Sequence, residues 1–546
     1  MAGAGATALV IAGLLMTAPL AQAQAVRTQQ ALPALGDGGD LDIRAERRLG
    51  DRIARELYRD PDFIDDAVVS DYLQGLWTPL LQAARLRGEI APELDERFVW
   101  EVLLGRDRSI NAFALPGGYL GVHLGLIAAS ANRDELASVL AHELSHVTQR
   151  HIARMITQSN RQMPLVLGAM ILGAIAAGKN PQAAGAVITG AQAAAIQGQL
   201  NYSRDMEREA DRVGMGILVQ AGFEPQGFVT LFEKLQQASR LNDSGAFPYL
   251  RTHPLTTERI ADMQARLPQG GPAAAGAAPH RLHHLVAARS RVLSQAQVDA
   301  LRARVVEAQP ALAASSTAPG SAEGSVSDGA LYAAALASLK LRDFAAADRF
   351  AQALAERVRN DEPAARLALL LRAEIALQTL QAAPAAPGTA ATPAAPATPA
   401  AAAMKAAADL KALMAQWPLP GDATQAARAH WLLWSQAWLA TGQTDLAAAR
   451  LQTWVALHPR DATAWQLLAS VQQQRGQVLR AIRAEAEAQV ARQDLPAALD
   501  RLRAAQDWIR RSPSAGGAAV DHIEASIIDT RAREVAALLR EQALER

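Results

Sequence analysis

The sequence predicts a mainly α-helical protein of the α+β class, with a small β-sheet in its first third and an all-α array in its C-terminal half. Half of the 546 residues are hydrophobic but only 4% are aromatic, because alanine dominates the apolar residues. Alanine is the strongest helix former. Segments rich in β-forming residues are confined to 98–123, and a helical pattern repeats later in the chain. This length favours two or more domains.

Charge and cysteine usage exclude several classes of function. Lysine plus arginine equals aspartate plus glutamate, at 54 each, so the net charge gives no sign of a nucleic-acid partner. The chain contains no cysteine. Disulfides, thiolate metal ligands and a cysteine nucleophile are therefore excluded, and histidine and carboxylate side chains remain as the candidate ligands for a metal.

Residues 1–25 have the pattern of a secretory signal peptide. A short apolar core at 8–16 precedes small residues suited to cleavage, either Ala21-Gln22-Ala23 or Ala23-Gln24-Ala25. No lysine or arginine precedes the core, so the usual charged start is missing. The core is shorter than the ~20 residues that cross a bilayer. We predict export, which in a bacterium means the periplasm.

The first predicted elements lead to a strand that could hold a substrate. Helical patterns cover about 42–59 and 64–86, and a short β-rich segment covers 98–104. A turn at Pro116-Gly117-Gly118 then leads into a second strand that starts with Gly118, Tyr119 and Leu120. An extended peptide could pair with this strand through its main chain. A purely structural hairpin is the alternative.

His142, Glu143 and His146 form a His-Glu-x-x-His pattern within a helix predicted from about Asn132 to Met155. Four residues turn a helix by about 400°, so both histidine rings leave the same face and can share one zinc ion. Glu143 lies about 100° from His142, within reach of a water at that metal. Two histidines on an ordinary helix face are the alternative. His151 is predicted on the opposite face, as a surface or packing residue.

A second helix offers the third metal ligand. Glu207 and Asp211 are four residues apart and share a face, whereas Glu209 points away. Glu207 could complete a His₂Glu ligand set, and Asp211 could hold the distal N–H of a ligand histidine. Gly222 is expected to end this helix. The alternative is a solvated helix face that carries Arg204, Arg208 and Arg212.

These motifs together resemble the Ste-type and HtpX-type gluzincin metallopeptidases, most closely the periplasmic BepA-like members. The resemblance covers roughly residues 40–265. It implies one Zn²⁺ per chain bound by His142, His146 and Glu207, with Glu143 as the catalytic residue. It also implies a role in outer-membrane protein assembly and quality control. The residues that carry it are Asn111, Pro116-Gly117-Gly118, His142-Glu143-Leu144-Ser145-His146, Glu207-Arg208-Glu209-Ala210-Asp211 and Thr252-His253-Pro254.

Two further features are open to more than one interpretation. His253 could stabilise an oxyanion, occupy the open metal position and so gate the site, or cap the next helix. The uncharged run within the apolar stretch 164–198 is shorter than a membrane span. We expect a buried helical hairpin there, and a mobile lid or a peripheral membrane contact is the alternative.

The C-terminal half predicts a protein-docking array. Trp431 and Trp465 are 34 residues apart and lie in repeated patterns that match the tetratricopeptide template. We assign 266–328 to a linker region with a helical segment, 329–511 to the repeats and 512–546 to a tail helix. A low-complexity insertion covers 382–403. Such arrays bind other proteins on concave surfaces. The sequence therefore predicts an exported zinc endopeptidase that docks proteins, and a chaperone-like scaffold with a latent protease site is the alternative.

Overall fold

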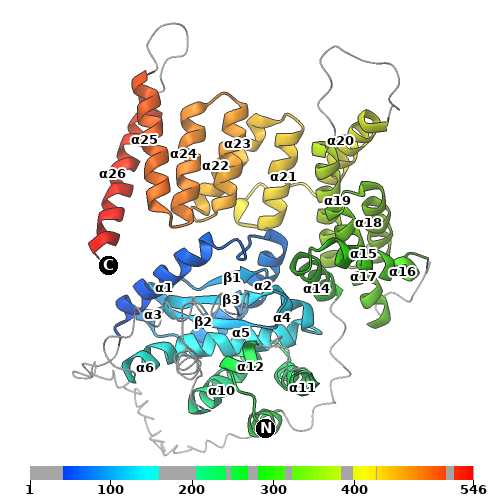
Figure 1. Ribbon diagram of the computed structural model, residues 1–546, viewed down its shortest axis with the longest axis vertical. Helices are drawn as coiled ribbons and strands as arrows, with labels where there is room; N and C mark the ends of the chain where they lie inside the picture. Colours follow the sequence, from blue (N-terminus) through cyan, green and yellow to red (C-terminus); the bar gives the residue numbers. More distant parts are fainter. Residues whose placement is uncertain are drawn as a thin grey trace, which may run out of the picture. The chain divides into compact units, whose positions relative to one another are not determined.

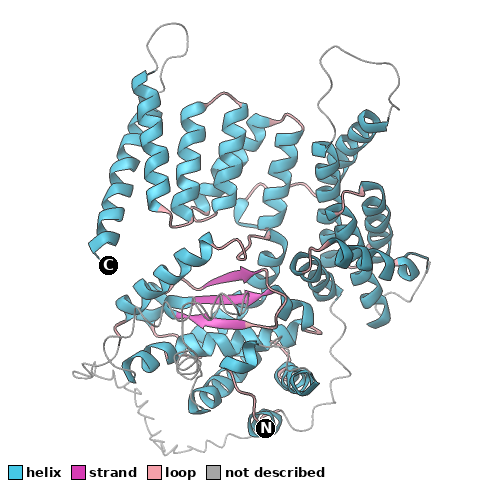
Figure 2. Ribbon diagram, in the orientation of Figure 1, coloured by secondary structure: helices cyan, strands magenta, loops and turns pink. Residues whose placement is uncertain are grey.

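The computed structural model describes residues 41–158, 204–241, 248–267, 281–313, 322–382, 398–425, 427–511 and 522–544. The predicted signal peptide, the apolar stretch 164–198 and most of the insertion at 382–403 lie outside these residues. Within them the fold is mainly α-helical with one small sheet, which confirms the predicted class (Figure 2).

Three helices precede the sheet in the chain and contribute many of the hydrophobic side chains that pack around it. The side chain of Asp42 caps α1 (Ile43–Arg59), and that of Asp66 caps α2 (Ala67–Leu86). Each helix buries one apolar face, which includes Leu49 and Ile53 on α1 and Trp77 and Leu80 on α2. Both helices were predicted, and a short α3 (Pro92–Arg97) follows them.

The sheet has three strands in the order β1-β3-β2. β1 (Glu101–Gly105) pairs in parallel with β3 (Tyr119–His123), and β2 (Ala112–Leu115) pairs with β3 in antiparallel register. The turn η1 (Pro116–Gly118) connects β2 to β3, with φ of 77° at Gly117 and 86° at Gly118. Glycine adopts these angles without steric cost, as the sequence predicted.

Two predictions about the strands need correction. The first strand begins at Glu101 and not at Phe98, because Phe98 ends α3 and Trp100 has a φ of 55° that interrupts an extended chain. The strand formed by Tyr119 and Leu120 is central, so both of its edges are already paired and no peptide can add to it. Among the described strands, β2 is the edge strand on the side of α5, which packs against it (Figure 1).

Helix α5 (Arg133–Thr148) lies at the centre of the first domain. Asn132 caps it with bonds to two backbone N–H groups, and every residue after Arg133 is buried. It ends at Thr148, and Arg150 then has a φ of 52°, so the predicted continuous helix to Met155 is wrong. The domain also contains α4 (Leu124–Ala129), α6 (His151–Gln158), α10 (Arg204–Gln220), α11 (Gln226–Leu241), α12 (Pro248–Thr252) and α13 (Thr257–Ala265).

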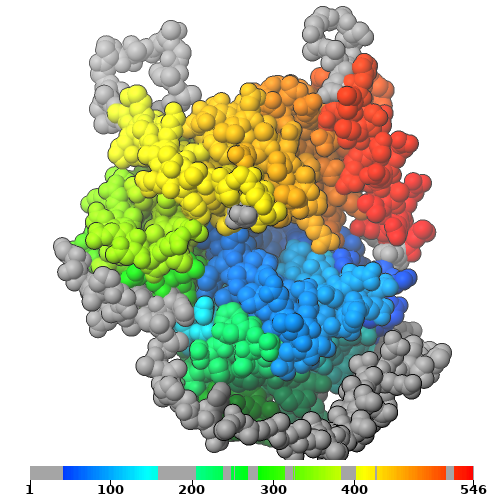
Figure 3. Space-filling view, turned by 180° about the vertical axis from the view of Figure 1, so that it is seen from behind, coloured from blue at the N-terminus to red at the C-terminus, as the bar shows by residue number. Residues whose placement is uncertain are grey.

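The rest of the described chain is helical. Neighbouring helices pack against each other, and Gly442 and Gly476 turn the chain between them with φ of 78° and 71°. Trp431 stacks on Trp454 with ring centroids 5.2 Å apart. Figure 3 shows the outer surface of the last helices in yellow to red. The helices are α14 (Arg281–Ser294), α15 (Val298–Glu307), α16 (Gln309–Ala313), α17 (Ala322–Lys340), α18 (Phe344–Val358), α19 (Glu362–Ala382), α20 (Thr398–Gln416), α21 (Arg428–Ala440), α22 (Thr444–Leu457), α23 (Ala462–Gln474), α24 (Val478–Ala491), α25 (Leu495–Arg511) and α26 (His522–Leu544), with a 3₁₀ turn, η2 (Ala423–Gln425), before α21.

Their assignment to tetratricopeptide repeats remains a prediction, as do the domain boundaries. None of the described helices combines the length and the apolar character needed to span a membrane.

Candidate metal centre

The centre forms where α10 packs against α5. At Gly214 of α10, an added Cβ would lie 3.1 Å from the carbonyl oxygen of Ala141 and 3.2 Å from Cα of His142. The absence of a side chain at Gly214 therefore lets the two helix backbones approach closely. Glu207 and Asp211 lie on the same helix, about two turns and one turn before Gly214 respectively, and both face His142.

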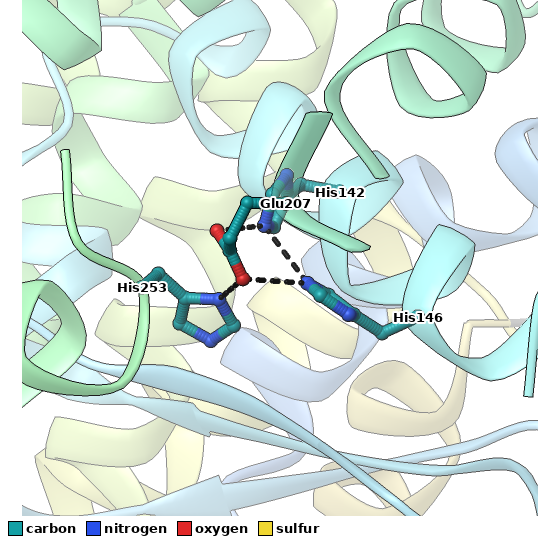
Figure 4. A group of neighbouring side chains, drawn as sticks. All are labelled: His142, His146, Glu207 and His253. Carbon is teal, nitrogen blue, oxygen red and sulfur yellow. Dashed lines mark hydrogen bonds and ion pairs between the residues drawn. The ribbon is translucent and has the colours of Figure 1, made fainter. Parts of the chain in front are cut away.

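Four buried side chains converge at this contact: His142, His146, Glu207 and His253 (Figure 4). The Nε2 atoms of His142 and His146 are 3.1 Å apart, and oxygens of Glu207 lie 3.6 Å and 3.5 Å from them. Two nitrogens bound to one tetrahedral zinc at ~2.0–2.1 Å would be about 3.3 Å apart. The donor set and its spacing therefore fit Zn²⁺, and none of the four side chains is more than 1% exposed.

A buried ion pair holds the His142 side of the centre. Nδ1 of His142 lies 3.0 Å from Oδ1 of Asp211. Arg259 of α13 donates two hydrogen bonds of 2.7 Å to the carboxylate of Asp211, and its Nη1 lies 2.8 Å from Oε2 of Glu207. One guanidinium thus pairs with both carboxylates. This leaves Nε2 of His142 directed toward the candidate metal position.

These contacts determine the charge state of the site. Burial by itself raises the pKa of Asp211, but the bonds from Arg259 and His142 outweigh it and lower that pKa below its usual value. Burial also raises the pKa of Glu207. The charge of His253 and hydrogen bonds from His142 and His253 outweigh this effect, so the pKa of Glu207 is well below its usual value. Burial and the charge of His142 lower the pKa of His146. Two ionised carboxylates therefore face a neutral imidazole.

The pKa of His142 moves the other way. Burial lowers it, but the bonds to Asp211 and Glu207 dominate and raise it to about 9. The carboxylates therefore hold a proton on His142 that must leave when a metal binds.

The structure corrects the predicted position of His151. Because the chain turns at Arg150, His151 does not lie on the far face of a continuous helix but packs beside His146 and is fully buried. The two Nδ1 atoms are 2.7 Å apart. Nε2 of His151 lies 3.0 Å from Oε2 of Glu209, which also accepts a 2.8 Å bond from Arg154. As predicted, Glu209 does not face the metal position.

Glu143 lies between the metal position and the sheet. Its Oε2 accepts a 2.9 Å hydrogen bond from the backbone N–H of Ala114 in β2. Its Oε1 lies 3.5 Å from Nε2 of His253. His253 also contacts Oε1 of Glu207 at 3.0 Å through Nδ1, and it stacks on Tyr249. His253 therefore touches the carboxylates of two helices at once.

The sequence did not single out Arg259, Tyr249 or Ala114 as site residues. Tyr249 is buried, and its hydroxyl makes no hydrogen bond within the described part of the chain. Arg259 follows the Thr-His-Pro turn by six residues, and an arginine that faces two acidic residues is a weak signal in sequence. Tyr119 was predicted to contact substrate, but its hydroxyl instead donates to Asp51, and Gly118 belongs to the turn.

A buried His₂Glu donor set on two packed helices, with a further helical glutamate that is hydrogen-bonded to a sheet edge, is typical of the class of zinc metallopeptidases. Comparison with known proteins finds similarity to the same class in one region of the chain. Residues 85–267 match Peptidase family M48. This region of the chain is therefore similar to the metallopeptidases of that family.

Curated relatives extend the similarity. The beta-barrel assembly-enhancing protease of Escherichia coli K12 is 35% identical over 243 residues, which cover 44% of this chain and 48% of that protein. A Vibrio cholerae protein that carries the same name provisionally is 37% identical over 294 residues, or 53% and 57% of the two chains. The mitochondrial metalloendopeptidase OMA1 of Saccharomyces cerevisiae is 30% identical over 207 residues, or 36% and 55%. The chain thus spans about half the length of the relatives it matches.

Proposed function

We propose that this protein is a zinc-dependent endopeptidase of the bacterial periplasm that cleaves unfolded or misassembled proteins and takes part in outer-membrane protein assembly. The observation that carries the proposal is the buried donor set of His142, His146 and Glu207 next to Glu143 and the edge strand β2. The names of the bacterial relatives support the assembly role. The signal-like pattern at residues 1–25 supports the location.

His142, His146 and Glu207 would hold the zinc. When bound, zinc lowers the pKa of water and polarises a peptide carbonyl. Arg259 keeps Glu207 and Asp211 ionised, so the ligand set retains its negative charge in a fully buried position. Asp211 would orient the ring of His142 through Nδ1.

Glu143 would act as the general base and then as the general acid. Its carboxylate would take the proton of the attacking water and pass it to the amine that leaves. The hydrogen bond from the N–H of Ala114 fixes one carboxylate oxygen and leaves the other directed into the site. Glu143 is therefore positioned by the strand along which we expect the substrate to lie.

The edge of β2 would hold the peptide in an extended conformation. The N–H of His123 donates to the carbonyl of Asn111, so this residue faces β3. Main-chain groups alternate along a strand, so those of Ala112 and Ala114 face away from β3. The N–H of Ala114 is already bonded to Glu143, so a substrate could pair by strand addition with the main-chain groups of Ala112 and the carbonyl of Ala114. This assigns to β2 the role that the sequence suggested for Tyr119 and Leu120.

His253 would gate the site. The metal ligands are almost fully buried, and His253 lies within contact distance of Glu207 and Glu143. In this position His253 occupies the space between the third ligand and the base, which is where a substrate carbonyl must enter. Withdrawal of the turn that carries His253 would open the centre, so we assign His253 the gating role rather than a role in helix capping.

The C-terminal helices would dock the substrate or a membrane assembly machine. A hollow of about 470 Å³ is lined by residues of α23, α24 and α25, among them Gln466, Gln473 and Gln489. The side-chain amides of these three glutamines make no hydrogen bond within the described residues. Glu485 and Arg501 lie 3.6 Å apart and neutralise each other. Uncharged amides that can both donate and accept suit the main chain of an extended polypeptide.

Cleavage of an unfolded protein such as β-casein tests the catalytic part of the proposal. The wild-type chain should cleave it, and Glu143→Gln should reduce the rate about 10²–10⁴-fold because the variant loses its general base. Glu258→Gln is the matched control, since Glu258 is an exposed carboxylate on α13. Cleavage by the wild type that does not exceed the level seen with Glu143→Gln would instead favour a scaffold with a latent site.

A further inference from the structure

His151 and Glu209 form a hydrogen-bonded chain that ends on the metal-facing histidine His146. Nε2 of His151 lies 3.0 Å from Oε2 of Glu209, and Nδ1 of His151 lies 2.7 Å from Nδ1 of His146. The chain therefore runs from a carboxylate, through one imidazole, to the back of another. His151 is fully buried, and Glu209 receives a second bond from Arg154.

The chemistry of the groups gives this chain a direction. An ionised carboxylate only accepts hydrogen bonds, so Nε2 of His151 carries the proton in its bond to Glu209. In a neutral imidazole the other nitrogen is then an acceptor, so Nδ1 of His151 accepts and Nδ1 of His146 donates. In this tautomer the lone pair of the His146 ring lies on Nε2. That atom is the one that lies 3.1 Å from Nε2 of His142 and 3.5 Å from Glu207.

The backbone is shaped to make this contact. If α5 continued past Thr148, His151 would point away from His146. The left-handed conformation at Arg150 turns the chain so that His151 packs beside His146. Such a conformation is strained for a non-glycine residue. It is held in place by Arg150 itself, whose Nε donates a 2.9 Å bond to the buried carboxylate of Glu46.

We propose that His151 and Glu209 are positioning residues that fix the tautomer and ring orientation of His146 for zinc. The inference rests on the proposed zinc site. It assigns a function to the second glutamate of Glu207-Arg208-Glu209-Ala210-Asp211, which the ligand set leaves unexplained. Carboxylate–histidine pairs that support a metal ligand typically contribute 10–100-fold to metal affinity. Here a second histidine is inserted between the carboxylate and the ligand.

The test measures zinc affinity of the full-length, metal-free chain by competition with a fluorescent chelator. His151→Phe keeps the ring shape but cannot accept a hydrogen bond, and it should weaken zinc binding 10–100-fold. His151→Gln restores an acceptor oxygen and should recover most of the loss. Glu209 is partly exposed, so we expect Glu209→Gln to fold normally. It should weaken zinc binding by a smaller factor than His151→Phe does. Glu258→Gln should bind zinc as the wild type does.

The Co²⁺ absorption spectrum of each loaded variant supplies a readout that a packing role would not change. Changed band positions in His151→Phe, with the wild-type spectrum in His151→Gln, support the inference. Equal zinc affinity and equal spectra in the wild type, His151→Phe and Glu209→Gln overturn it. In that case a wild-type chain that still binds zinc and cleaves casein leaves the proposed function intact. A wild-type chain that binds no zinc overturns both.

Discussion

The two histidines of the metal centre are supported in different ways. On one side, His142 contacts Asp211, and Arg259 donates two hydrogen bonds to the same carboxylate. All three side chains are buried. On the other side, His146 contacts His151, and the chain of bonds continues through Glu209 to Arg154, whose side chain is 44% exposed. One support ends in a buried ion pair, and the other ends at the surface.

This difference predicts which residues affect both folding and zinc affinity and which affect mainly zinc affinity. A buried arginine that serves two carboxylates cannot be removed without leaving uncompensated charge in the interior. An exposed arginine at the end of a relay is screened by water and contributes little to stability. We therefore expect changes on the His142 side to affect folding and zinc together. Changes on the His146 side should affect zinc with a small effect on folding.

The largest effect is expected for Arg259→Ala. It leaves Asp211 and Glu207 buried without a counter-charge, which should lower the free energy of unfolding by about 3–5 kcal/mol. Urea denaturation monitored by circular dichroism measures this loss. Arg208→Ala is the control, because Arg208 is 46% exposed and its ion-pair partners among the described residues are exposed carboxylates. This variant should change stability by less than ~1 kcal/mol. Similar losses in the two variants would remove the distinction.

Asp211→Asn should have the next largest effect. The amide keeps the size of the side chain but loses the charge that orients His142, so we expect zinc affinity to fall about 10–100-fold. Chelator competition measures this change. Because Arg259 also loses a charged partner, stability should fall as well, unlike in Glu209→Gln. If Asp211→Asn lowered zinc affinity without lowering stability, the His142 side would behave like the His146 side, which would contradict the comparison.

Gly214→Ala should affect both sides at once. Its methyl group would lie 3.1–3.2 Å from the backbone at Ala141 and His142, so α10 must move away from α5. Overpacking of this kind costs about 1–3 kcal/mol. We expect a lower thermal midpoint together with weaker zinc binding. Gly75→Ala on α2, where an added methyl meets nothing within 4 Å, is the control and should not be destabilised by overpacking.

Arg154→Ala should have the smallest effect. Glu209 keeps its bond to His151, and the arginine is largely in water, so stability should change by less than ~1 kcal/mol. Zinc affinity should change less than it does in Glu209→Gln. A loss of zinc affinity as large as that of His151→Phe would show that the relay depends on its exposed end.

Much of the fold followed from local patterns. The apolar spacing of α1 and α2 and the Pro-Gly-Gly turn are short-range signals, and the structure has those elements where the sequence predicted them. The helical spacing of His142 and His146, and of Glu207 and Asp211, likewise predicted which side chains share a face. The structure then brings the two faces together.

What the sequence could not supply depends on contacts between distant segments. Arg150 has no local reason to adopt a positive φ, and its side chain bonds to Glu46 and to the carbonyl of Leu41, which are more than 100 residues earlier in the chain. The central position of β3 depends on strand pairing, which periodicity does not determine. Arg259 lies 48 residues from Asp211, so their pairing is invisible in the sequence.

The most direct test of the account is the position of the metal. Diffraction from crystals of the zinc-loaded chain, recorded on both sides of the zinc absorption edge, locates zinc without any assumption about the ligands. We predict one peak per chain at ~2.0–2.1 Å from Nε2 of His142 and of His146, and at a similar distance from an oxygen of Glu207. A zinc peak that lacks any of these three ligands, or no peak at this centre, would contradict the account.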